Sequence, residues 1–104
     1  MSAAEGHRAM PALLISLREG VQSPEGGTRS LIAERVSQRW ADSRQIEGSN
    51  WVVECSGPAD DIRDQLADLL REDDALVVIG AGSEAAWAGL GSADADWLAE
   101  HLSD

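Results

Sequence analysis

Apolar and polar residues follow one another along this chain in short blocks, and the spacing of the apolar positions changes from block to block. The run 12–17 reads ALLISL and the run 75–79 reads ALVVI, so both are almost continuously apolar. Apolar runs of this length are typical of strands that are buried on both faces. We therefore expect a sheet with strands at 12–17 and 75–79.

Two other stretches space their apolar residues three or four positions apart, which is the spacing of one helix face. In the first stretch, Thr28 is a candidate N-cap, and we expect the helix to end near Ala41. Its apolar face consists of Leu31, Ile32, Val36 and Trp40. The second stretch starts at Pro58, which suits a first helical turn, and ends before Asp73. Its apolar face consists of Ile62, Leu66, Leu69 and Leu70.

The residues between these helices predict a β-hairpin. Two short runs at 44–47 and 51–55 flank Gly48, Ser49 and Asn50, and a glycine-containing loop of this length joins antiparallel strands. Near the end of the chain, Ser92 can cap a short helix that turns Trp97 and Leu98 inward.

The predicted element order is β-α-β-β-α-β with a C-terminal extension that ends in a short helix. This order predicts an α+β fold, specifically a ferredoxin-like sandwich with an antiparallel sheet and both main helices on one face. A chain of 104 residues has the size of one domain. Residues 1–10 are polar and without pattern, so we expect a disordered leader at 1–10 and a single domain at 11–104.

Composition narrows the location and the partners. No apolar run approaches the roughly 20 residues of a membrane helix, and the N-terminus has no signal-peptide pattern. The single cysteine, Cys55, cannot form an internal disulfide. We expect a cytoplasmic protein without a membrane anchor.

The chain is strongly acidic, with 8 Lys+Arg against 19 Asp+Glu and a formal net charge of -11. Such a surface repels phosphate, which argues against nucleic acid as a partner and favours a protein partner. Three arginines on the outer face of the first helix, Arg29, Arg35 and Arg39, could form a basic patch. The alternative is an ordinary solvated helix face.

The sequence predicts no metal site, no cofactor and no catalytic residue of its own. His7 and His101 lie far apart in sequence, and Cys55 has no histidine near it. Gly80 and Gly82 follow a strand, as in a dinucleotide-binding loop, but the chain ends before a second parallel strand could form. We interpret these glycines as a bend where the strand leaves the sheet.

Trp87 lies among small residues, at the centre of the run 84–90, EAAWAGL. Small neighbours would leave its ring standing above the backbone. The ring could pack in the core under the last helix, or it could anchor a partner, since tryptophan is enriched in interface hot spots. The residues alone leave both interpretations open.

Several motifs resemble one protein family. They are Trp40 near the end of the first helix, GSNWVVE at 48–54, DDIRDQLADLL at 60–70, and DDALVV followed by EAAWAGL at 73–78 and 84–90. With these motifs the chain resembles the SinR-like family, which is related to the CRISPR-associated protein two endoribonuclease-like and VapD-like families. The resemblance implies a ferredoxin-like fold and a homodimer whose subunits meet after the last strand. The implied interface residues are Ile79, Ala86, Trp87 and Leu90.

In some relatives the resemblance also implies metal-dependent RNA cleavage, with an aspartate at the end of the first strand in a pattern like S-Y-D. Here the matching residues are Ser16, Leu17 and Arg18, and an arginine opposes cation binding. Glu19 is the nearest carboxylate, but a shift of one residue turns a strand side chain to the opposite face.

We therefore expect a homodimeric, non-catalytic structural or interaction protein. One alternative is a metal-dependent endoribonuclease in which Glu19 or an acidic pair holds Mg²⁺. A second alternative is an acidic partner of a basic toxin, or a nucleic-acid mimic, which the net charge of -11 permits.

Overall fold

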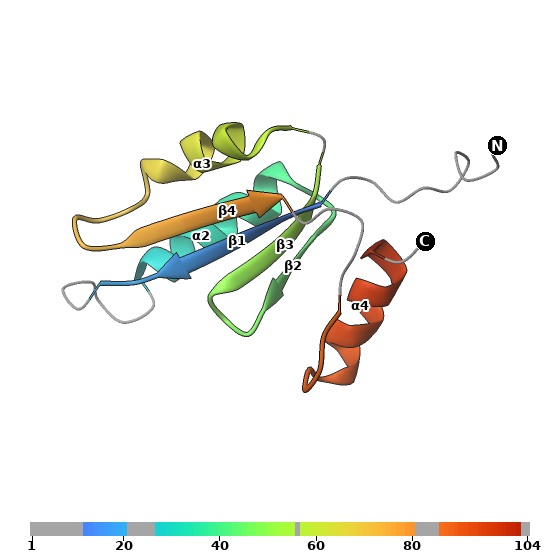
Figure 1. The fold of residues 1–104 in the computed structure, drawn as a ribbon. Coiled ribbons are helices and arrows are strands. Elements are labelled where there is room, and N and C mark those ends of the chain that lie inside the picture. The colour runs from blue at the N-terminus through green and yellow to red at the C-terminus, as the bar shows by residue number, and fades with distance from the viewer. Residues whose placement is uncertain (1–11, 21–26, 56, 81–85, 103–104) are drawn as a thin grey trace.

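The computed structural model describes residues 12–20, 27–55, 57–80 and 86–102 (Figure 1). Its elements are β1 (Ala12–Arg18), α2 (Gly27–Arg39), β2 (Ser43–Ile46), β3 (Asn50–Glu54), α3 (Ala59–Ala67), β4 (Ala75–Gly80) and α4 (Ser92–Leu102). Every predicted helix and strand is present, and the predicted α+β class is confirmed. Helix α3 ends at Ala67 rather than just before Asp73, so Leu69 and Leu70 pack against the core from the turn that follows the helix. The predicted leader at 1–10 lies outside the described residues. None of the helices in the described ranges is both long enough and apolar enough to span a membrane.

The four strands form one sheet in the order β2-β3-β1-β4, and each neighbouring pair is antiparallel. The central strand β1 pairs with β3 along one edge and with β4 along the other. Strands β2 and β4 are therefore the two edges of the sheet. The predicted antiparallel sheet is confirmed.

Helices α2 and α3 cover one face of the sheet. Side chains alternate between the two faces of a strand, and Leu13, Ile15 and Leu17 of β1 all enter one core cluster. The other buried members of this cluster come from β3 and from the two helices: Trp51, Val53, Ile32, Val36, Ile62 and Leu66. Because residues of α2 and α3 share a cluster with the same strand positions, both helices lie on the same side.

Helix α4 packs against the opposite face. A second cluster joins Ala12 of β1, Ile46 of β2 and Val52 of β3 to Leu98 of α4, with Leu14, Leu90 and Trp97 packed around it. Figure 1 shows α4 set apart from α2 and α3. The C-terminal extension therefore covers the side of the sheet that the two main helices leave open.

The predicted hairpin is confirmed, with its strands one residue earlier than expected. Strand β2 ends at Ile46 and β3 begins at Asn50, so the turn is 47–49 rather than 48–50. Glu47 and Gly48 both have positive φ angles, 55° and 80°, a backbone conformation that glycine adopts readily and that glutamate adopts rarely. The sequence pattern alone located Gly48 but not its left-handed neighbour Glu47.

The start of α2 differs from the sequence-based expectation. Thr28 was expected to cap the helix, but it lies inside the first turn, fully buried. Its hydroxyl donates a hydrogen bond to Asp74 Oδ2 at 2.7 Å. The backbone N–H of Arg29 instead donates to Glu19 Oε2 at 3.0 Å, so a carboxylate from the preceding segment satisfies this helix terminus.

Leu31 was expected on the buried face of α2, and it is 41% exposed. The buried positions of α2 are Thr28, Ile32 and Val36, which are four residues apart. A stripe of that spacing leaves the position before Ile32 at the edge of the packed surface.

The carboxylate of Asp74 connects three segments of the chain. It accepts hydrogen bonds from the Gly20 N–H at 2.7 Å, from the Thr28 hydroxyl at 2.7 Å and from the Arg71 N–H at 2.8 Å. These donors lie after β1, in α2 and before β4. A Cβ atom at Gly20 would collide with the carboxylate of Asp73, so a larger residue there would require that side chain to move.

We predict that Thr28→Val lowers the free energy of unfolding by about 1–3 kcal/mol, because a buried hydroxyl loses its bond to a carboxylate while shape is conserved. Ser37→Ala is the control, since its exposed hydroxyl bonds only the backbone carbonyl of Glu34 and should change stability by under about 0.5 kcal/mol. Urea unfolding of both variants checks this. Equal stability of the two variants would contradict the role given to Asp74.

Candidate interaction surface on β4

Strand β4 is an edge strand with an unusually apolar sequence, ALVVIG. Its outer edge has no strand partner within the part of the chain that the structure describes. Exposed edges usually carry a lysine, a proline or a bulge that discourages pairing with another chain. The residues of β4 include neither a charged side chain nor a proline.

One face of β4 exposes two large apolar side chains, Val77 and Ile79. In the β1–β4 ladder, Val77 lies opposite Ser16 and Ile79 lies opposite Leu14. Leu14 belongs to the cluster under α4, so Val77 and Ile79 point to the same side of the sheet as α4. They are nevertheless 50% and 53% exposed.

The position of α4 explains this exposure. Leu98 packs with Ile46 and Val52, and Arg44 Nε of β2 donates to Asp94 Oδ1 at 2.8 Å. Both attachments hold α4 over the β2 and β3 half of the sheet. The β4 half of that face is left without a helix among the described residues.

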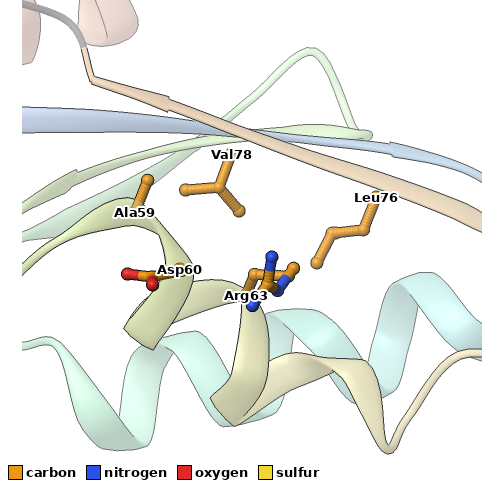
Figure 2. Close-up of a pocket in the computed structure, with 5 residues that line it drawn as sticks. All are labelled: Ala59, Asp60, Arg63, Leu76 and Val78. Carbon is orange, nitrogen blue, oxygen red and sulfur yellow. The ribbon is translucent and has the colours of Figure 1, made fainter.

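The other face of β4 borders a shallow groove against α3 (Figure 2). The groove has a volume of about 210 Å³ and is lined by Ala59, Asp60, Arg63, Leu76 and Val78. Leu76 and Val78 point toward α3 in Figure 2. Small-molecule pockets are usually about 300–1,000 Å³ and enclosed. This open groove is therefore small for a ligand pocket, and its lining combines apolar side chains of β4 with the charged Asp60 and Arg63 of α3.

The four predicted interface residues differ in their exposure to solvent. Ala86 and Trp87 are exposed, Trp87 at 36%, in the segment that leads into α4. Ile79 is exposed on β4. Leu90, however, is half-buried and packs against the cluster under α4. Three of the four side chains are thus available to a partner, and Leu90 already contributes to the packing of its own chain.

The residues that bear on nuclease chemistry lie at the end of β1. Arg18 is the last residue of β1 and is exposed, opposite Ala75 of β4. Glu19 is the residue whose carboxylate accepts the Arg29 N–H. The carboxylate nearest to the expected metal position therefore has a structural role at the start of α2.

Two of the three arginines proposed as a basic patch contact α3. Arg35 donates to the Gln65 carbonyl at 2.7 Å and to Asp68 Oδ1 at 3.0 Å, and Arg39 donates to Gln65 Oε1. The hydrogen bond from Arg35 is the main reason why the pKa of Asp68 lies below its ordinary value. Arg35 and Arg39 thus join α2 to α3, and whether Arg29, Arg35 and Arg39 bind a partner stays a prediction.

The fold also brings together three residues that sequence reasoning left apart. One ligand atom each of Asp42, Glu54 and His101 lies within 4.8 Å of the other two. They come from the connection between α2 and β2, the end of β3 and the last turn of α4. No local spacing links these positions, so only the β-hairpin register combined with the docking of α4 could have predicted the cluster.

The glycine bend predicted at Gly80 and Gly82 falls mainly in 81–85, outside the described residues.

No protein-family model and no curated protein matches this chain.

We predict that Leu98→Ala lowers the free energy of unfolding by about 2–5 kcal/mol, because Leu98 fills the contact between α4 and the sheet. Leu31→Ala makes the same chemical change at an exposed position and should cost under about 1 kcal/mol. Urea unfolding followed by tryptophan fluorescence measures both values. A Leu98→Ala variant as stable as Leu31→Ala would show that α4 is not packed on the sheet as described.

Proposed function

We propose that this chain is a structural or interaction protein that forms a homodimer along β4. The observation that carries the proposal is the exposure of Val77 and Ile79, 50% and 53%, on an edge strand without a charge or a proline. Apolar side chains and open backbone groups on the same strand favour pairing with another strand. Trp87, also exposed, would add an aromatic anchor from the segment before α4.

A second copy of the chain is the simplest partner for this strand. Antiparallel pairing of β4 with its own copy is two-fold symmetric, so the contact closes after two subunits. Pairing centred on Val78 would place Val77 of each copy opposite Ile79 of the other, on the same face of a continuous eight-stranded sheet. Four exposed apolar side chains would then gather between the two α4 helices.

Charge determines where two such copies can meet. Each chain has a formal net charge of -11, so two copies repel one another over most of their surface. The uncharged strand β4 is the part of the edge where this repulsion is weakest. Salt at about 0.15 M reduces the screening length to about 8 Å, so association should be favoured at physiological ionic strength.

We further propose a ferredoxin-like topology for the fold. The order β2-β3-β1-β4 supports this assignment, because β3 separates β1 from β2 and β1 separates β3 from β4. Each βαβ unit is therefore split by a strand of the other unit, the arrangement named split βαβ. The same topology is what kinship with the SinR-like family would require.

We propose that the dimer acts in the cytoplasm and has no nuclease activity of its own. Two observations support the absence of catalysis: Arg18 stands where related enzymes would need a metal-binding aspartate, and Glu19 binds the Arg29 N–H. An arginine at that position disfavours a bound cation.

We predict that the wild-type chain sediments as a dimer at micromolar concentration and that Val77→Lys sediments as a monomer. A lysine at this edge position introduces a charge that must be desolvated on pairing. Because the substitution makes the net charge less negative, added repulsion between whole molecules cannot explain a monomer. Trp87→Ala should weaken association by at least about 30-fold, equivalent to about 2 kcal/mol.

Leu31→Lys is the matched control, since Leu31 is a large exposed apolar residue on α2, on the opposite side of the sheet from Val77. It should remain dimeric. A monomeric wild type would contradict the proposed dimer. A dimer that survives both Val77→Lys and Trp87→Ala would show that the interface lies elsewhere.

We predict no cleavage of labelled RNA or DNA by the purified protein in the presence of Mg²⁺ or Mn²⁺. Glu19→Ala is the diagnostic variant. Cleavage by the wild type that is lost in folded Glu19→Ala would overturn the non-catalytic proposal and favour the nuclease alternative.

A further inference from the structure

The cluster of Asp42, Glu54 and His101 is built by three separate elements. The backbone N–H of Glu54 donates to the Asp42 carbonyl at 2.8 Å, which holds the start of the hairpin beside the end of β3. Glu54 lies opposite Ala12 in the β1–β3 ladder, and Ala12 packs in the cluster under α4. The side chain of Glu54 therefore points to the side of the sheet where α4 carries His101.

Hydrogen bonding determines which nitrogen of His101 can bind a ligand. Nδ1 lies 2.9 Å from the carbonyl oxygen of Trp97, and a carbonyl oxygen can only accept. In a neutral imidazole with this partner, Nδ1 carries the proton and Nε2 keeps a lone pair. The imidazole ring also stacks on Trp97, with centroids 3.9 Å apart and planes 13° apart. A metal-binding histidine commonly has this backbone partner on its second nitrogen, which fixes the orientation of the ring.

The two carboxylates of the cluster have no positive or hydrogen-bonding side-chain partner in the described part of the chain that would offset their negative charge. Within the described ranges, neither Asp42 nor Glu54 has a side-chain hydrogen bond or an ion pair. Two negative groups held this close repel one another unless a cation lies between them. Glu54 and His101 are half-buried and Asp42 is exposed, so the site is partly accessible to solvent.

We propose that Asp42, Glu54 and His101 bind a divalent transition-metal ion of the Zn²⁺ class and that the ion fastens α4 to the sheet. Imidazole and carboxylate ligands together suit Zn²⁺, whereas Mg²⁺ prefers oxygen ligands and retains its water. In a tetrahedral site with bonds of about 2.0–2.2 Å, ligand atoms lie about 3.3–3.6 Å apart. Binding therefore requires the present separations of up to 4.8 Å to shorten to that range.

The site would connect parts of the chain that are far apart in sequence. Asp42 and Glu54 flank the hairpin, and His101 lies in the last turn of α4. The other end of α4 is held by the ion pair between Arg44 and Asp94. A bound ion would thus provide the second fixed end of the helix. A Zn²⁺ ion bound by these three side chains would have a fourth coordination position for water.

The test is calorimetric titration of the metal-free chain with ZnCl₂, and with MgCl₂ for comparison, beside thermal unfolding with and without Zn²⁺. We expect one Zn²⁺ per chain, a higher unfolding temperature with Zn²⁺ and no saturable Mg²⁺ binding. Loss of an outer partner of a metal site costs about 10–100-fold in affinity, so loss of a ligand in Glu54→Gln or His101→Gln should weaken binding at least 10-fold.

Two further variants make the outcome unambiguous. Asp42→Asn changes an exposed ligand, and it should weaken Zn²⁺ binding at least 10-fold without changing the far-ultraviolet dichroism. Glu100→Gln removes one exposed negative charge from α4 outside the cluster and should bind as the wild type does. No saturable Zn²⁺ binding, or equal weakening by Glu100→Gln and Asp42→Asn, would overturn the proposal.

Discussion

A four-stranded sheet has two faces and two edges, and the helices of this chain cover only part of them. Helices α2 and α3 bury one face through the odd-numbered residues of β1. Helix α4 is attached to β2 and β3 on the other face. The β4 half of that face and the outer edge of β4 remain open among the described residues, and this incomplete cover is the constraint on which the proposed function depends.

The same incomplete cover explains why the side chains near β2 differ in polarity from those near β4. On the β2 and β3 half of the sheet, Arg44 forms an ion pair with Asp94 of α4, and Glu54 lies close to His101 of α4. At the β4 edge, Val77 and Ile79 are exposed without charged neighbours on their own strand. A self-associating surface and a metal site would therefore occupy opposite halves of the sheet, and the two proposals can fail independently.

The element pattern was predictable because each strand and helix has a clear local signal. The continuous apolar runs predicted strands β1 and β4, and the four-residue spacing of Ile62 and Leu66 predicted the buried face of α3. The expectation that β4 is buried on both faces is wrong, because β4 is an edge strand and its Val77 and Ile79 are 50% and 53% exposed. The features that the pattern could not predict depend on tertiary contacts. Thr28 lies inside α2 because Glu19 binds the helix terminus and Asp74 binds its hydroxyl. Leu31 has the same apolar character as Ile32, and only the packing angle of α2 exposes it.

The candidate sites divide in the same way. Ile79 could be identified from the sequence because it ends an apolar strand run, and Trp87 because it lies among small residues. Both side chains are exposed. The packing of Leu90 under α4, the contacts of Arg35 with α3 and the meeting of Asp42, Glu54 and His101 depend on how distant elements dock. Periodicity reports which face of an element is apolar, but it does not report which other element lies against that face.

The central claim is that a second copy covers the edge of β4, and residue-resolved amide hydrogen exchange tests it most directly. The account predicts that the outward-pointing amides of β4 are protected at high protein concentration and exchange faster on dilution, while the amides of the central strand β1 stay protected throughout. Outward β4 amides that exchange rapidly at every concentration would contradict it.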